Sequence, residues 1–403
     1  MSHVIEINEV GQLEHYRLAW QSLLSSTPCG SFFHTLDWLE LYWRHFAEDQ
    51  KLRVLVVHAE GKPIGILPLC VDTERSRLGV IRKLTYPVPP WATSFGPIGP
   101  NPTATLLVAM RHIRETPRDW DLIDLPSIDE SDGGRTERAL RAQGFSTASE
   151  PWASASVVRL DSSWDQYVAS RDAAWQEEHR RGQQQLAARG EVRFVRYRPQ
   201  GFAYDDGDPR WDLYTACEEI SQSNTGSNAG NGVVHGTGNG KTTRDETTGR
   251  FLRDVHETAV ARGMLDLCLL LVAQQPVAYL TSYHDQGRLL TVRTGVVPAW
   301  AGSGANHVLW ANALEDSFVR GDRRYEIPAD VAERCSGFVT DVESSWRLLH
   351  YRPLDVRAQA VRLKSWRRRR ASEAAGTAVS RGRRLGLLPR HPGLGLTQPV
   401  SHG

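Results

Sequence analysis

The sequence is poor in cysteine. Its 403 residues contain five, at Cys29, Cys70, Cys217, Cys268 and Cys335. Their number is odd and their spacing is wide, and the sequence contains neither a Cys-x-x-Cys pair nor a Cys/His cluster at zinc spacing. This pattern argues against a disulfide framework and against a metal site, so we expect no bound metal.

Long apolar runs and a strong net charge are also missing. The longest apolar stretch, 265–273, is interrupted by Asp266 and is too short to span a bilayer. The first twenty residues lack the basic-then-apolar pattern of a signal peptide. With 48 Lys and Arg against 47 Asp and Glu, the formal charge is only +1, which gives no overall field to attract nucleic acid or an anionic membrane. These absences predict a soluble, cytoplasmic protein.

Hydrophobic and aromatic residues are plentiful enough to build sizeable cores. They include 13 Trp, 11 Tyr and 10 Phe, and 40% of the chain is hydrophobic. At roughly 150 residues per domain, the length predicts two domains and additional segments.

The charge is unevenly distributed. Residues 361–403 contain ten Lys and Arg and one acidic residue, a net +9, which leaves −8 for residues 1–360. This tail is rich in Gly, Pro, Ser and Ala, so we expect a short basic helix followed by disorder. Either the tail contacts anionic lipid or nucleic acid, or it is an unspecific solubilising appendage.

Hydrophobic periodicity predicts two consecutive α/β units. The first has a helix at 37–46, a hairpin of strands at 53–58 and 64–71, a helix at 103–114 and a strand at 121–125. The second has a polar helix at 164–190, a helix near 211–220, a polar tract at 222–243, and strands at 265–272, 277–283 and 288–297.

The segment after the last of these strands has the pattern of an anion site. The strand ends before Pro298, a turn of Gly302-Ser303-Gly304-Ala305 follows, and a helix begins whose apolar residues repeat at helical spacing. Free backbone N–H groups at a helix N-terminus can bind a pyrophosphate, and glycine lets the phosphate approach them. The alternative is a tight strand-to-helix connection without a ligand. A parallel strand, Arg323–Ile327, is expected next.

Antiparallel strands, a glycine loop, a helix and a further strand resemble the acyl-CoA half of the GNAT N-acetyltransferase fold. The motifs SFFHTLDWLELYW and RVLVVHAEGKPIGILPL resemble the opening of the CelD-like (cellulose-biosynthesis-type) acetyltransferases, which are related to the Fem peptidyltransferases. The resemblance implies an α/β (α+β) fold of two tandem GNAT-like mixed-sheet domains. We place the first at 1–150, without a cofactor site, the second, acyl-CoA-binding domain at 151–355, and the basic tail at 356–403.

The function implied by the resemblance is direct transfer of an acyl group from acyl-CoA, most simply acetyl-CoA, to an amine. The acceptor would be a sugar, a polysaccharide precursor or a peptide. Val296 and Val297 would pair with the pantetheine arm, and the turn residues Gly302, Ser303, Gly304 and Ala305 would hold the pyrophosphate.

A base is needed because an alkylammonium is no nucleophile. Residues 288–301 contain no carboxylate, so Glu326, at the end of the next strand, is the first candidate, and Asp330 is the second. Tyr325 could act as a general acid, although strand alternation places it on the face opposite Glu326. The alternatives are a solvated or ion-paired carboxylate for Glu326 and a core position for Tyr325.

Three positions depart from the family pattern. Ala299 replaces the Gln or Arg of the loop, Glu343 replaces a lysine, and the Ser-Trp-Lys motif would fall at Ser223-Asn224-Thr225. These departures keep two rivals open. One is a catalytically silent GNAT-fold scaffold, and the other is a Fem-like user of aminoacyl-tRNA whose tail binds RNA phosphates.

Overall fold

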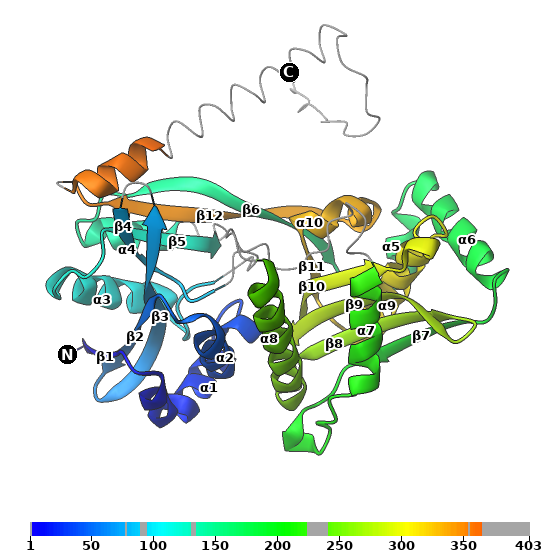
Figure 1. The fold of residues 1–403 in the computed structure, drawn as a ribbon, viewed down its shortest axis with the longest axis horizontal. Coiled ribbons are helices and arrows are strands. Elements are labelled where there is room, and N and C mark those ends of the chain that lie inside the picture. The colour runs from blue at the N-terminus through cyan, green and yellow to red at the C-terminus, as the bar shows by residue number, and fades with distance from the viewer. Residues whose placement is uncertain are drawn as a thin grey trace, which may run out of the picture.

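Twelve strands form one continuous sheet in the computed structural model, which describes residues 2–76, 79–88, 95–129, 134–223, 241–353 and 355–364. Their order is β1-β2-β3-β4-β5-β12-β6-β11-β10-β9-β8-β7. Two helix-bearing halves lie side by side along this sheet (Figure 1). The expected α/β fold with mixed strand directions is therefore confirmed.

The first half alternates short helices with antiparallel strands. Its elements are β1 (Ser2–Ile7), η1 (Val10–Tyr16), α1 (Arg17–Ser25), η2 (Phe32–His34), α2 (Leu36–Phe46), β2 (Gln50–Ala59), β3 (Lys62–Ser76), β4 (Gly79–Thr85), α3 (Pro102–Glu115), β5 (Leu122–Asp129), α4 (Arg135–Ala142) and β6 (Ala148–Arg159).

The second half repeats this plan. Its elements are α5 (Trp164–Ala169), α6 (Ala173–Ala187), β7 (Val192–Tyr197), η4 (Phe202–Tyr204), α7 (Trp211–Ser223), α8 (Lys241–Ala261), β8 (Leu265–Val272), β9 (Gln275–Asp285), β10 (Arg288–Val296), η5 (Pro298–Trp300), α9 (Ala305–Arg320), β11 (Arg324–Pro328), α10 (Ala329–Ala332), η6 (Glu333–Phe338) and β12 (Asp341–Tyr351).

The halves exchange their last strands. In each half four antiparallel strands are followed by a helix and a strand parallel to the fourth, β4 with β5 and β10 with β11. The last strand of the first half, β6, pairs with β11, whereas the last strand of the second half, β12, pairs with β5 and with β6. The domain boundary that we expect near residue 150 falls within β6.

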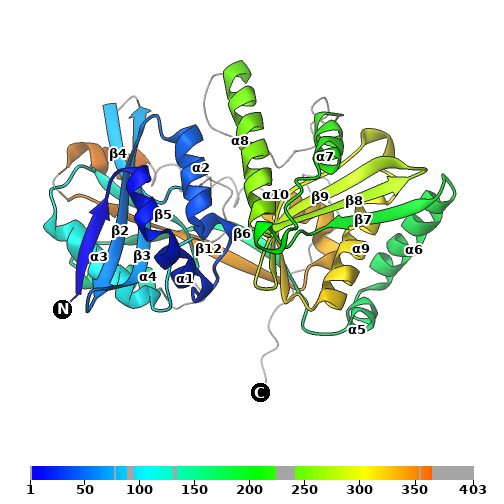
Figure 2. The ribbon, with the colours of Figure 1, turned by 90° about the horizontal axis from the view of Figure 1, so that it is seen from below.

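Helices cover both faces of the second half (Figure 2). Helices α5, α6 and α9 lie on one face, and α7 and α8 lie on the other. The apolar core under α7 and α8 continues into the first half, where Trp38 packs against Phe251 with ring centroids 5.5 Å apart. Burial of this shared core couples the two halves.

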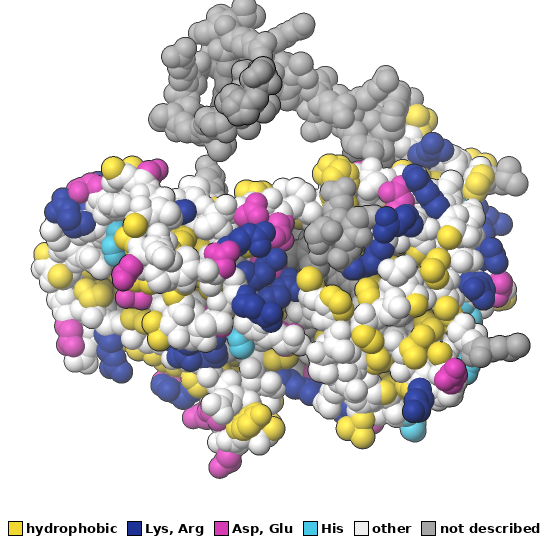
Figure 3. Space-filling view, turned by 180° about the vertical axis from the view of Figure 1, so that it is seen from behind, with side chains coloured by type: hydrophobic (Ala, Val, Ile, Leu, Met, Phe, Trp, Pro, Cys, Tyr) yellow, Lys and Arg dark blue, Asp and Glu magenta, His cyan; other side chains and the backbone are white. Residues whose placement is uncertain are grey.

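Most of the expected elements are present, with three corrections. The helix expected at 164–190 is two helices, because the chain breaks at Ser170–Asp172 and Asp172 caps α6 by accepting from the Trp175 N–H. The hairpin strands are longer than expected, and β1 and β4 extend the sheet beyond them. Figure 3 shows Lys and Arg side chains gathered near the middle of one face, with Asp and Glu side chains beside them. The tract at 224–240 and the tail from 365 lie outside the described residues.

Candidate functional site

Strands β10 and β11 separate after a short parallel contact. Only Arg288, Leu289 and Leu290 pair with Arg324, Tyr325 and Glu326, while β10 continues for six more residues to Val296. A bulge in the β9–β10 pairing between Thr291 and Arg293 coincides with the point of separation. The result is a slot between the two strands whose closed end, here called the vertex, is the pair Leu290 and Glu326.

The two valines assigned to the pantetheine differ in what their backbone offers. The Val297 N–H donates to the Val277 carbonyl of β9 at 2.9 Å. Because successive backbone groups of a strand point to opposite sides, Val296 directs its N–H toward the slot. Val296 therefore presents a free strand edge to a ligand, and Val297 supports the strand from behind.

The glycine turn leads directly into α9. Gly304 is the N-cap residue with φ of 78°, and a Cβ at this position would lie 2.6 Å from the Cα of Gly182 in α6. Gly304 is thus required for the close approach of two helices, whether or not a phosphate binds. Gly302 is exposed with no atom within 4 Å of such a Cβ. The Ser303 hydroxyl donates to the Trp300 carbonyl at 2.7 Å.

The first turn of α9 keeps backbone donors for an anion. The N–H groups of Ala305, Asn306 and His307 precede the first intrahelical bond, which the Val308 N–H donates to Gly304. They lie at the positive end of a helix of 16 residues. Position 299 is alanine, so it adds no side-chain charge to these backbone donors.

Glu326 is buried at the vertex and is ion-paired. One oxygen lies 2.6 Å from the Arg288 guanidinium and 3.1 Å from that of Arg324, and the side chain is 5% exposed. Glu326 is therefore an ion-paired carboxylate, which was one of the alternatives for it. Glu343, which stands where the family has a lysine, lies 2.6 Å from Arg324. The reversed charge thus has a partner of opposite sign.

The other two sequence candidates do not join Glu326. Tyr325 lies on the opposite face of β11, fully buried, where its ring packs edge-to-face against Trp310 and its hydroxyl is 3.0 Å from that of Ser282. Burial raises the pKa of Tyr325. The side chain of Asp330 lies outside the described residues, as does Asn224 of the departing motif.

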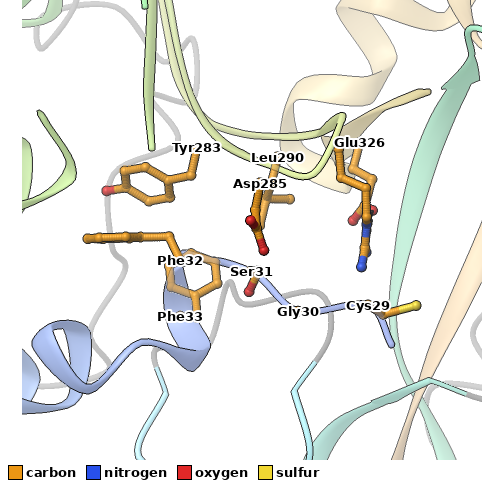
Figure 4. Close-up of a pocket in the computed structure, with 10 residues that line it drawn as sticks. Cys29, Gly30, Ser31, Phe32, Phe33, Tyr283, Asp285, Leu290 and Glu326 are labelled. Atoms are coloured by element: carbon orange, nitrogen blue, oxygen red, sulfur yellow. Dashed lines mark hydrogen bonds and ion pairs between the residues drawn. The ribbon is translucent and has the colours of Figure 1, made fainter. Parts of the chain in front are cut away.

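A pocket opens at the vertex and is shared by both halves. The loop ahead of η2 and η2 itself supply one wall, and strands β9, β10 and β11 supply the other (Figure 4). Its lining residues are Cys29, Gly30, Ser31, Phe32, Phe33, Tyr283, Asp285, Arg288, Leu290 and Glu326. Both vertex residues belong to this set, so the slot and the pocket meet there.

Sequence reasoning missed most of this pocket. Its first-half wall lies about 250 residues from its second-half wall along the chain, and Asp285 reads as part of the turn HDQG. The SFFHTLDW motif is the one sequence signal for this wall, through its family resemblance. Its Phe32 packs against Tyr283 with ring centroids 4.6 Å apart.

Arg293 is a second residue that the sequence did not single out. It follows the bulge in β10, is paired with Glu218 of α7, and lies 5.8 Å from the Tyr279 ring centroid. Burial tends to lower the pKa of Arg293, but Tyr279 and Glu218 outweigh this effect and raise it. The pairing keeps a buried cation on the α7 face of the slot.

In the described part of the chain, no group of three or more His, Cys, Asp or Glu side chains could hold a metal ion. None of the helices in the described ranges is long and apolar enough to cross a bilayer.

A family model of known proteins matches part of the second half. Residues 173–332 match the family model described as an acetyltransferase (GNAT) domain. These residues include β10, the glycine turn, α9 and β11, so the GNAT part of the resemblance is confirmed. No curated protein matches the sequence.

Two solved structures resemble the fold over most of the chain. FemX has a TM-score of 0.56 and 10% identity, and the match covers 87% of this chain and 97% of FemX. A conserved protein of unknown function from Bacteroides thetaiotaomicron has a TM-score of 0.50 and 8% identity, with coverage of 87% and 100%. At such identities the likeness concerns the fold.

Proposed function

We propose that this protein is an acyltransferase that moves an acyl group from a donor in the slot between β10 and β11 to an amine in the pocket. The observation that carries the proposal is the shared vertex, because Leu290 and Glu326 close the slot and also line the pocket. An acyl group at the vertex would face an acceptor that approaches from the other side.

The donor that fits best is an acyl-CoA, most simply acetyl-CoA. Its pantetheine amides can pair with the free edge of β10 at Val296, as an added strand would. Its pyrophosphate can be bound by the α9 N-terminus behind Gly302, Ser303, Gly304 and Ala305. The same Val296 N–H lies in the right strand to stabilise a developing oxyanion.

The acceptor is proposed to be an amine on a sugar, a polysaccharide precursor or a peptide. This class follows from the CelD-like resemblance, whose first motif supplies Ser31, Phe32 and Phe33 to the pocket. Aromatic side chains with two carboxylates and an arginine suit a polar ligand that has one flat face.

Glu326 has a role at the vertex that differs from the sequence-based hypothesis. Two guanidinium groups bind its carboxylate, so this carboxylate is already engaged in ion pairs. We therefore propose that Glu326 orients Arg288 and Arg324 at the vertex, and that another carboxylate of the pocket takes the proton.

Ligand-induced stabilisation tests the donor site. A ligand that binds only the folded state stabilises it by RT ln(1 + [L]/Kd), about 2.7 kcal/mol at a hundredfold excess over Kd. Acetyl-CoA and CoA at 1 mM, a concentration chosen at roughly that excess for a Kd of about 10 µM, should both raise the melting temperature. If neither ligand raised the melting temperature, the proposed acyl-CoA donor would be refuted and the catalytically silent scaffold would be favoured.

The aminoacyl-tRNA alternative has its own signature. Binding of tRNA should weaken steeply with salt and should disappear when residues 361–403 are deleted. Contact of this tail with anionic lipid or nucleic acid and a cytoplasmic location both remain predictions from the sequence.

A further inference from the structure

The pocket contains two carboxylates in different environments. Glu326 is bound by Arg288 and Arg324. Asp285, the last residue of β9, is half-buried, and within the described ranges its carboxylate makes no hydrogen bond or ion pair. Figure 4 shows this carboxylate pointing from β9 toward Ser31 and Gly30, across the pocket.

Strand register brings Asp285 into line with the vertex. Asp285 pairs with Arg288, and Tyr283 pairs with Leu290, so both pairs project on the same face of the sheet. Asp285 is therefore the next side chain on this face of β9 after Tyr283, which pairs with Leu290 at the vertex. A group held between Asp285 and Leu290 would lie beside an acyl carbon at the vertex.

Gly30, in the loop ahead of η2, brings the backbone of the first half close to Asp285. A Cβ at Gly30 would lie 3.5 Å from Oδ2 of Asp285 and 3.2 Å from Leu24 Cδ1. The loop thus narrows the pocket around the carboxylate without supplying a side chain to bind it. A small cationic group of a ligand can take that position.

The charged and titratable groups near Asp285 come from both halves. The groups near it are His284, Arg288 and Glu326 from the sheet, and Cys29 and His34 from the first half. Arg288 is already paired with Glu326, and burial lowers the pKa of His34 to about 3, so His34 is uncharged at neutral pH. Burial raises the pKa of Asp285, while His284 and Arg288 oppose the rise. A raised pKa makes a carboxylate a better proton acceptor.

We propose that Asp285 is the catalytic residue that binds the acceptor's ammonium group and takes a proton from it, an assignment that rests on the proposed function. The ammonium transfers one proton to Asp285, and the freed lone pair forms a bond to the acyl carbon. The carbon–sulfur bond then breaks, its electron pair leaves with sulfur, and the second proton moves from nitrogen to the thiolate. The products are an amide, the free thiol and protonated Asp285.

The exposed thiol of Cys29 allows a test that needs no known acceptor. Cys29 lines the pocket, whereas Cys70, Cys217, Cys268 and Cys335 are buried. The probes are two methanethiosulfonates of equal length, one carrying a trimethylammonium group and the other a sulfonate. The measurement is the ratio of their labelling rates at Cys29, divided by the same ratio for glutathione.

Asp285→Asn should lower this cation-to-anion ratio by about threefold to tenfold, as expected for the loss of one charge within several ångströms. Asp285→Glu should keep the ratio of the wild type. Asp161→Asn, which removes an exposed carboxylate outside the pocket, should leave the ratio unchanged. Asp285→Ser replaces the asparagine variant if that variant does not fold. An unchanged ratio in the folded uncharged variant would overturn the assignment.

Transfer kinetics supply the second readout. For an amine that the wild type acetylates, Asp285→Asn should lower kcat/KM by about 100-fold or more and leave stabilisation by CoA intact. Full activity in this variant would also overturn the assignment. If CoA does not stabilise the wild type, the proposed function is refuted. The labelling ratio would still report on the charge at Asp285.

Discussion

Gly304 and Gly302 lie in the same turn but differ in whether packing requires a glycine. The sequence motif assigns both to a phosphate, but the structure gives Gly304 a packing role against Gly182 and leaves space around Gly302. A substitution at 304 alters the fold before it can report on a ligand.

We predict that Gly304→Ala destabilises the protein by at least about 2 kcal/mol. Alanine is strained in the left-handed conformation, and its Cβ would clash with the backbone of Gly182. Gly302→Ala should change the free energy of unfolding by less than about 0.5 kcal/mol. Urea unfolding of both variants measures the difference. Equal effects would contradict the packing role of Gly304.

His307, in the first turn of α9, makes stability depend on pH. Its ring packs against Trp175 and Phe338, and burial, helped by His179, lowers the pKa of His307 from 6.5 to about 4. Between those values the unfolded chain binds more protons than the folded chain, so stability falls as the pH drops from 6.5 to 4.

His307→Gln should flatten the decline by up to about 3 kcal/mol, the linkage expected from a shift of this size. Other buried histidines, such as His34, still contribute to the pH dependence of stability in this variant. Chemical denaturation at several pH values between 4 and 7 checks this. Parallel curves for variant and wild type would show that His307 does not contribute.

At the scale of the elements, a ladder of alternating charges crosses β12, β6, β11 and β10. Its members, in spatial order, are Asp341, Arg159, Glu343, Arg324, Glu326 and Arg288. The ladder is exposed at Asp341 and buried at Glu326, so its inner and outer pairs should differ in energy.

Glu326→Gln should cost about 3 kcal/mol of stability, because it leaves two arginines without their shared, buried partner. Glu343→Gln, at a carboxylate that is 38% exposed, should cost no more than about 1 kcal/mol. Unfolding free energies at neutral pH and low salt make the comparison. A larger loss for Glu343→Gln would contradict the proposed gradient of burial.

Local elements of the sequence were predictable, and the pairing of distant strands was not. The helix at Ala305–Arg320 follows from the spacing of Trp310, Ala313 and Leu314, and the parallel strand follows from its connection. The separation of β10 from β11 depends on a bulge, and the strand exchange depends on contacts between distant residues. Sequence reasoning named Glu326, which lines the pocket, but not Asp285, because the pocket forms only where residues 29–33 meet the strands of the second half.

At the scale of the whole molecule, the shared core and the exchanged strands should make the two halves unfold together. Phe251 of α8 packs against Trp38 and Phe46 of the first half, with ring centroids 5.5 and 4.7 Å apart. Strand β12 joins β5 to β6, so each half also depends on a strand of the other.

Phe251→Ala should destabilise both halves by about 3–5 kcal/mol, the usual cost of emptying a buried aromatic position. Val319→Ala, at a side chain that is 81% exposed, serves as the control and should have little effect. Proteolysis in increasing urea, with fragments assigned by mass, reports on each half separately. A first half that keeps its resistance in Phe251→Ala would contradict the coupling.

In the proposed function, a donor occupies the slot between β10 and β11 and meets its acceptor at the vertex. Hydrogen exchange with and without acetyl-CoA tests it most directly. We predict slower exchange at residues 291–296 of β10 and at 305–307 of α9, with no change in the corresponding strand and helix of the first half, β4 and α3. Unchanged exchange at both sites, or protection confined to the first half, would contradict it.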